Sequence, residues 1–193
     1  MKRILLVRPP GSKGKEIALS LVEYLSENDN LECISTGDLV DKEISKRSAF
    51  GKEIEQSRQT CSFVKDEIVI ELVKTQVELM EKQKKSYIIE GFPRTEVQAI
   101  SLMKMGIIPD KFILLQQDDS FSEDKIRASL ASEDAIVKCK DPTQMDRLSK
   151  ATIRENNIHM AAVRNVCHGF ITELDGMKNQ TQILEEIARV LKL

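Results

Sequence analysis

The sequence predicts an α/β fold, a doubly wound sheet of five parallel strands with helices on both faces. Short apolar segments alternate with longer amphipathic segments along the 193 residues, which is typical of strand–helix–strand units. No repeat and no linker rich in proline or glycine interrupts the alternation, and 41% of the residues are hydrophobic, enough for one core. Right-handed crossovers between successive strands then place helices on either face of the sheet.

Five short apolar segments are the expected strands. They cover about residues 3–7, 32–35, 87–90, 111–115 and 169–174. The first apolar run, within MKRILLV, is too short for the core of a signal peptide and is better interpreted as a buried strand. In a parallel sheet the carboxyl ends of the strands meet at one edge, so we expect ligands to bind in the loops at that edge.

Longer segments with apolar residues at helical spacing are the expected helices. The clearest, over about 65–82, carries Val69, Val73, Val77 and Met80 at that spacing. A helical stretch also follows residue 38 and breaks near 48–51. Further helices are expected over about 15–28, 95–105, 122–130, 147–166 and 181–191. Residues 131–146 are polar and weakly patterned, so we expect no long helix there.

Charge and cysteine usage argue against several classes of protein. The 29 basic and 31 acidic residues nearly balance, so the composition gives no reason to expect a nucleic-acid or membrane partner. No apolar run approaches about 18 residues, so we expect no transmembrane helix. The four cysteines have no CxxC spacing and only two histidines could join them, so we expect reduced thiols in a cytoplasmic protein and no metal site.

Three loops at the carboxyl ends of expected strands carry the chemistry. EGFPRT at 90–95 follows the third strand directly, with Gln98 one helical turn beyond Arg94. STGD at 35–38 follows the second strand, and RPPGSKGK at 8–15 follows the first. A guanidinium such as that of Arg94 presents a fork of donors that can grip a phosphate. Each motif alone has a structural alternative, such as a tight turn at Gly91 or a helix cap at Thr36.

In this order and spacing, the three loops resemble the adenylate kinase family over nearly the whole chain. That family's patterns are GxPGSGKGT, STGDxxR and DGFPRTxxQ, of which the last is specific. The resemblance implies a P-loop NTPase-like fold and phosphoryl transfer from ATP to AMP, with Mg²⁺ accompanying ATP. It implies an AMP site made of Thr36, Gly37, Val64, Gly91, Arg94 and Gln98, and an ATP-phosphate loop made of Pro10, Gly11, Ser12, Lys13, Gly14 and Lys15.

The resemblance also implies individual roles. Arg94 would hold the monophosphate, Gln98 would read an edge of adenine, and the carbonyl of Val64 would contact the base. Glu90 stands where the family has aspartate, and it keeps a carboxylate for a network of magnesium-bound water. The expected catalytic cations are Lys13, Lys15, Arg94 and Arg147.

The first loop departs from the family pattern. Aligned without gaps, four positions change: Arg8 replaces the first glycine, Lys13 the second, Gly14 the lysine and Glu16 the threonine. Sliding by one residue restores the GK pair but leaves Pro9 at the first glycine. Side chains at such glycines obstruct the approach of phosphate, and Glu16 would repel it. We therefore expect weakened ATP binding, unless the cations of the loop compensate.

Two further regions differ from the family. Asp41 stands at the position of the arginine in the monophosphate loop, a reversal of charge, with Lys42 beside it. The arginines around the family's ATP lid fall near Lys125 and Ser129, and Arg147 is one candidate beyond the lid. We therefore expect one adenylate-kinase-like domain over 1–193, with a monophosphate-binding insert at about 36–66 and a short or rewritten lid at about 131–146.

The sequence supports two main functional hypotheses. The first is an adenylate kinase that converts ATP and AMP to two ADP at a reduced rate, because several phosphate-binding charges differ. The second is a nucleotide-binding or structural protein that lost most catalysis and serves a larger assembly such as a ciliary axoneme, by family analogy. Action on another monophosphate is a weaker third hypothesis, because Thr36 and Gln98 favour adenine.

Overall fold

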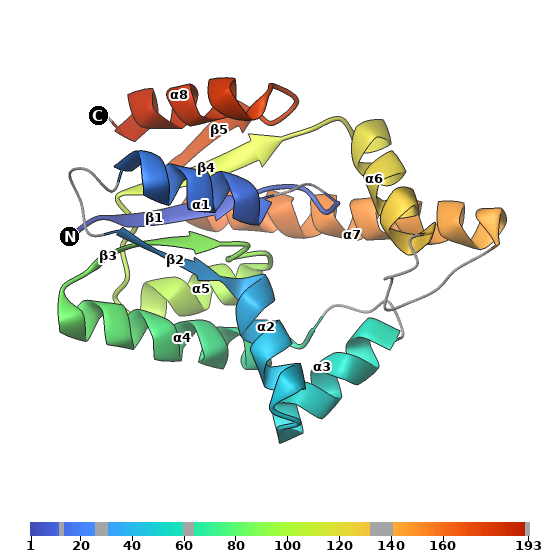
Figure 1. Ribbon diagram of the computed structural model, residues 1–193, viewed down its shortest axis with the longest axis horizontal. Helices are drawn as coiled ribbons and strands as arrows, with labels where there is room; N and C mark the ends of the chain where they lie inside the picture. The colour runs from blue at the N-terminus through green and yellow to red at the C-terminus, as the bar shows by residue number, and fades with distance from the viewer. Residues whose placement is uncertain (12–13, 26–30, 60–63, 132–140, 192–193) are drawn as a thin grey trace.

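The chain folds around one all-parallel sheet of five strands, which confirms the predicted fold class (Figure 1). The computed structural model describes residues 1–11, 14–25, 31–59, 64–131 and 141–191. The strand order in the sheet is β2-β3-β1-β4-β5. The strands are β1 (Arg3–Val7), β2 (Leu31–Ser35), β3 (Ser86–Glu90), β4 (Lys111–Gln116) and β5 (Ile171–Asp175).

Helices cover both faces of the sheet. In Figure 1, α1 and α8 lie on one face, and α4 and α5 lie on the other. The helices within the described residues are α1 (Gly14–Leu25), α2 (Thr36–Ser45), α3 (Ala49–Gln59), α4 (Asp66–Gln83), α5 (Glu96–Lys104), α6 (Asp119–Ala131), α7 (Pro142–Cys167) and α8 (Gln180–Leu191).

Successive residues of the central strands enter two separate cores. Leu5 and Ile89 pack with apolar residues of α4, α5 and α7. Their neighbours Ile4 and Ile88 pack with α1 and α8 on the other face. Strands buried on both faces need a continuous apolar run rather than an alternating one, which is why RILLV and SYIIE are readable as strands.

The strand register brings the three motif loops to one edge of the sheet. Glu90, the last residue of β3, aligns with Leu6 of β1 on one side and with Ser35 of β2 on the other. The segments that follow Val7 and Glu90 and the start of α2 therefore leave the sheet next to one another.

Several helices begin earlier than the sequence pattern predicts. α7 begins at Pro142 rather than near residue 147, because the Asp141 carboxylate accepts a hydrogen bond from the Thr143 backbone N–H at 3.0 Å and proline suits the first turn. Residues 142–146 of the expected lid are therefore helical, while 132–140 lie outside the described residues. α6 likewise begins at Asp119 rather than near residue 122.

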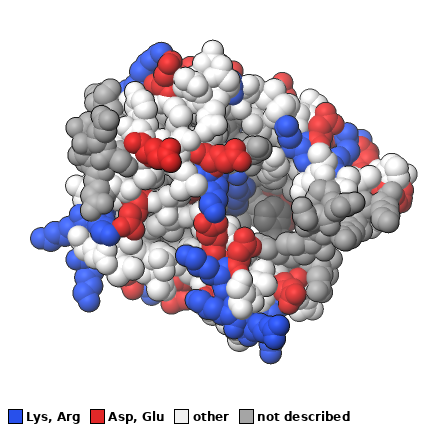
Figure 2. All heavy atoms as spheres, viewed as in Figure 1, with Lys and Arg blue, Asp and Glu red and all other residues white. Residues whose placement is uncertain are grey.

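The described residues also give two negative findings. None of their helices is both long and apolar enough to cross a membrane. Within the same ranges, no cluster of three histidine, cysteine, aspartate or glutamate residues is arranged to hold a metal ion. Acidic and basic side chains are interspersed over the face shown in Figure 2.

Candidate active site

A pocket of about 220 Å³ lies at the carboxyl ends of β2 and β3. All the residues that the resemblance assigns to AMP line it: Thr36, Gly37, Val64, Gly91, Arg94 and Gln98. The remaining lining residues are Val40, Asp66, Val69 and Thr95. The three valines make part of the wall apolar, and the hydroxyl, carboxylate, guanidinium and amide side chains make the rest polar. We call this the monophosphate pocket, after the ligand that the resemblance leads us to expect.

Gly91 is required by the backbone at the floor of the pocket. Its φ of +84° lies in the region that favours glycine, and a Cβ there would lie 2.4 Å from Thr36 Oγ1. The Thr36 hydroxyl donates to the Glu90 carbonyl at 2.9 Å, so it sits across the turn. The buried Phe92 and the cis Phe92–Pro93 peptide complete the turn into α5. The Gly-Phe-Pro part of the motif therefore shapes the floor, and polar residues follow it at the start of α5.

Gln98 is 4% exposed, and its amide orientation is fixed by the protein. Its Oε1 accepts from the Arg94 backbone N–H at 2.7 Å, and its Nε2 donates to Asp66 Oδ1 at 2.7 Å. The other carboxylate oxygen of Asp66 accepts from the Thr95 hydroxyl at 2.8 Å. Among the described residues, one Nε2 hydrogen and one Oε1 lone pair of Gln98 have no further partner, which is the pair of functions needed to recognise a base edge.

Arg94 lies between the monophosphate pocket and the first loop. Its Nε donates to the Gly91 carbonyl at 3.1 Å, and its Nη1 donates to the Arg8 carbonyl at 3.4 Å. Burial lowers the pKa of Arg94, and the Glu90 carboxylate opposes that shift. A guanidinium stays charged at neutral pH even so. A buried cation beside a pocket, with donors that the described residues leave unused, is suited to a phosphate.

Arg8 and Glu90 form an ion pair beneath the first loop. Arg8 Nε donates to Glu90 Oε1 at 3.3 Å, and the Ser35 hydroxyl donates to Glu90 Oε2 at 3.2 Å. The side chains of Arg8 and Glu90 are 13% and 6% exposed. Burial lowers the pKa of Arg8, while the nearby Glu90 raises it. The side chain of Arg8 thus points into the site rather than into solvent.

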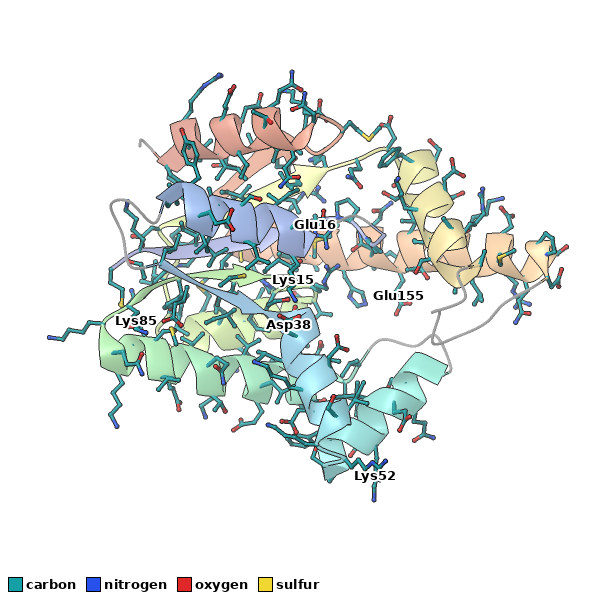
Figure 3. The ribbon with its side chains drawn as sticks, in the orientation of Figure 1. Lys15, Glu16, Asp38, Lys52, Lys85 and Glu155 are labelled. Atoms are coloured by element: carbon teal, nitrogen blue, oxygen red, sulfur yellow. The ribbon has the colours of Figure 1, made fainter. Side chains whose placement is uncertain are left out.

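The other residues of the expected phosphate loop have different surroundings. Pro10 and Gly11 form a turn, and Gly11 has a φ of +81° and lies against Lys125 of α6. Gly14 is buried at the start of α1. Ser12 and Lys13 lie outside the described residues. Lys15 donates to Asp38 Oδ1 at 2.7 Å, so this expected catalytic lysine is paired with α2 (Figure 3).

The cations of α6 and α7 beside the expected lid are mostly tied to acidic neighbours or exposed. Arg127 joins α6 to α7 through Asp146, at 3.0 Å, and Lys150 pairs with the same carboxylate at 2.8 Å. Arg147 is exposed on α7 and is not among the residues that line the monophosphate pocket. Asp41 is likewise exposed on α2 and does not line that pocket.

Two features of the site were not predicted from the sequence. Asp66 fixes the amide of Gln98, and Arg8 reaches Glu90. The role of Asp66 could have been predicted, because its carboxylate is close in the sequence to Val64, which was already assigned to the site. The second had a weaker signal, a charged residue directly after a buried strand.

The chain is similar in sequence to proteins of one family. The sequence model of a family described as "Adenylate kinase" matches residues 6–184. The adenylate kinase of Wolbachia sp. subsp. Drosophila simulans (strain wRi) is 27% identical, with 95% of each chain covered. That of Mycoplasmopsis pulmonis is 25% identical over both full lengths.

A third relative has a different donor in its name. The GTP:AMP phosphotransferase of Plasmodium falciparum is 34% identical over 113 residues, which cover 58% of this chain and 47% of that protein. The family match spans most of the chain, including all three motif loops. The chain therefore belongs to the adenylate kinase family of nucleoside monophosphate kinases, as a divergent member whose phosphate loop departs from the family pattern.

Proposed function

We propose that the protein transfers a phosphoryl group from ATP to AMP, forming two ADP, at a rate below that of family members with an intact phosphate loop. One observation carries the proposal: the monophosphate pocket is lined by the six residues assigned to AMP from the sequence. Those residues come from three separate segments of the chain, 36–37, 64 and 91–98, so an accidental grouping is a poor explanation of the pocket.

In this proposal the pocket holds AMP by its base and its phosphate. The free hydrogen and lone pair of Gln98 face the base, and the Val64 carbonyl adds a further acceptor. Val40 and Val69 provide apolar walls for the flat faces of a purine. The Arg94 guanidinium receives the monophosphate at the side of the pocket nearest to the first loop.

Phosphoryl transfer then depends on position and charge more than on covalent chemistry. Mg²⁺ enters with ATP as part of the substrate. Each oxygen of Glu90 accepts one hydrogen bond from Arg8 or Ser35 and keeps a lone pair for water bound to that ion. Lys13, Lys15 and Arg147 are proposed as further cations, and Lys15 must leave Asp38 to serve. That requirement is one reason to expect a reduced rate.

A second candidate is a protein that binds nucleotide and turns it over very little. Two observations favour it: Lys15 is paired with Asp38, and Asp41 puts a negative charge on the helix that begins at Thr36. Such a protein would act by binding nucleotide rather than by converting it, for example within a larger assembly. The two candidates share AMP binding and differ in turnover.

The remaining proposals concern organisation. Residues 36–66 would act as the insert that binds the monophosphate, and about 131–146 as a short lid over the donor, within one domain. The donor base is proposed as adenine. The partners would be ATP and AMP rather than nucleic acid or membrane.

A coupled assay of ADP production with ATP, AMP and Mg²⁺ separates the two candidates, with AMP affinity measured in parallel. Gly37→Leu tests the pocket: an added Cβ has Ser35 Oγ at 3.7 Å as its nearest neighbour, so a side chain fits the fold but enters the space beside the base. We expect AMP affinity and turnover to fall at least about tenfold. Gly169→Leu is the matched control, because nothing lies within 4 Å of a Cβ there.

The outcomes are distinct. Turnover that AMP stimulates and Gly37→Leu abolishes supports the kinase. AMP binding without ADP formation by folded protein supports the second candidate. A Gly37→Leu variant that binds AMP as well as the control contradicts the proposed pocket.

A further inference from the structure

The first loop contains an exchange of a cation and a glycine. In the alignment without gaps, Arg8 stands where the family has glycine, and Gly14 stands where it has the phosphate-binding lysine. Arg8 alone would fill the loop, and Gly14 alone would remove its charge. The two residues lie side by side in space.

Arg8 occupies the space into which a side chain at position 14 would extend. A Cβ on Gly14 would lie 1.5 Å from Arg8 Nε, 2.2 Å from Cδ and 2.3 Å from Cζ. No side chain at position 14 is compatible with this placement of Arg8. The guanidinium thus begins where the family's lysine side chain would leave the backbone, and the glycine makes room for it.

The guanidinium is only partly satisfied within the protein. Its Nε pairs with Glu90, whose second oxygen already accepts from Ser35. Its Nη1 is buried and has no hydrogen-bond partner among the described residues. A buried donor without an acceptor is costly, and such atoms usually mark a missing ligand or water.

The donors around Arg8 suit an anionic ligand. Arg94 donates to the Arg8 carbonyl, so two buried guanidinium groups lie at one edge of the sheet. Glu90 interacts electrostatically with both, and Glu16 adds a weaker negative charge near Arg8. A ligand with several acceptor oxygens would supply the acceptor that Nη1 lacks.

We propose that Arg8 is the cation that binds the phosphate chain of the donor nucleotide, in place of the lysine missing at position 14. The inference rests on the proposed function, since it assigns a residue to the donor side of the same site. The loop would then keep its phosphate-binding charge, but the charge would come from Arg8 at the start of the loop rather than from position 14 at its end. The rival interpretation is that Arg8 is a plug that excludes phosphate.

The test measures Kd for MgATP and for AMP separately, by calorimetry on the full chain. Arg8→Gly removes the cation, Gly14→Lys adds the family's lysine against Arg8, and the double variant R8G/G14K restores the family arrangement. Arg47→Gly is the matched control: it removes an exposed arginine whose φ of +52° glycine tolerates.

We expect R8G to weaken ATP binding by about tenfold or more, since it removes charge-assisted hydrogen bonds. G14K should weaken it too, because the two side chains compete for one space, and the double variant should recover most of the loss. AMP affinity should change little in any of them. R8G also removes the cation that pairs with Glu90, so a second variant that keeps Arg8 is needed. In Gly14→Ala the added methyl group displaces the guanidinium, and ATP binding should weaken.

Tighter or unchanged ATP binding in R8G and G14A would overturn the inference and identify Arg8 as a plug. Absence of ATP binding by the unmodified protein would overturn it as well. Absence of AMP binding by the unmodified protein would instead count against the proposed function, while the ATP measurements would still decide the role of Arg8.

Discussion

At the scale of single residues, two glycines in the site make room for a polar group of another segment. Gly14 makes room for Arg8, and Gly91 makes room for Thr36. The glycine of the GFPRT motif is therefore required by the close packing around the backbone. That part of the site can be tested without any nucleotide.

Gly91→Ala should destabilise the protein more than Gly106→Ala. Both glycines have positive φ, of +84° and +72°, so alanine costs about 1–2 kcal/mol at either. Only at Gly91 does the new Cβ also meet Thr36 Oγ1, at 2.4 Å, whereas nothing lies within 4 Å at Gly106. Overpacking should add about 1–3 kcal/mol. Urea unfolding measures the difference, and equal costs would contradict the close approach of Thr36.

The sequence predicted single residues where a motif is contiguous and anchored on a strand. Thr36, Gly91, Arg94 and Gln98 all line one pocket, and their contacts with AMP stay a prediction. Arg8 was interpreted only as an obstruction, because its partner Glu90 is 82 residues away. A pattern along the chain gives the position of a side chain but not the direction in which it points.

At the scale of elements, a polar network holds the start of β1 to the end of α4. Arg3 Nε and Nη2 donate to the two carboxylate oxygens of Glu81 at 2.7 and 2.9 Å, and the Tyr87 hydroxyl donates to Glu81 at 2.8 Å. This geometry is bidentate and partly buried, unlike the Lys74–Glu78 pair at 4.0 Å on the same helix. The network should therefore stabilise the packing of α4 on the sheet.

Glu81→Gln should cost about 1–2 kcal/mol near pH 7, against almost nothing for Glu78→Gln. Arg3 holds the pKa of Glu81 below its ordinary value of 4.5. A carboxyl group whose pKa is lowered by folding stabilises the folded state at pH values above its ordinary pKa. This contribution is lost as the pH falls through the pKa that the group has in the folded state. Chemical unfolding at several pH values should show the cost of Glu81→Gln shrinking below about pH 4.5. A cost independent of pH would contradict the ion pair.

Elements were predicted well where apolar spacing is regular and less well at their ends. The central strands and α4 follow from their apolar pattern, because burial dictates it. The start of α7 was placed too late, since its first turn is polar and only the Asp141–Pro142 pair marks it. Capping is a local signal that hydrophobic spacing does not contain.

At the scale of the whole molecule, the strand order explains why distant motifs meet. β1 lies between β3 and β4, and β3 separates it from β2. The carboxyl ends of these strands therefore lie together at one edge of the sheet. The apolar pattern of the sequence does not specify this strand order. The strand order was therefore not predicted, since many orders would satisfy the same alternation of strands and helices.

Binding at such a convergence should stabilise the entire fold. AMP contacts α2, α4 and the loop after β3 in the proposed pocket, and unfolding separates all of them. At 100 times its Kd, AMP should add about 2.7 kcal/mol to the free energy of unfolding, or roughly 5–10 °C to Tm. GMP should add less, because Gln98 offers a fixed donor and acceptor chosen for adenine. Thermal unfolding measures both, with Gly37→Leu as the variant that should lose the shift. Equal shifts with AMP and GMP would show that the pocket reads the phosphate and not the base, and the orientation that Asp66 imposes on Gln98 would then serve packing alone.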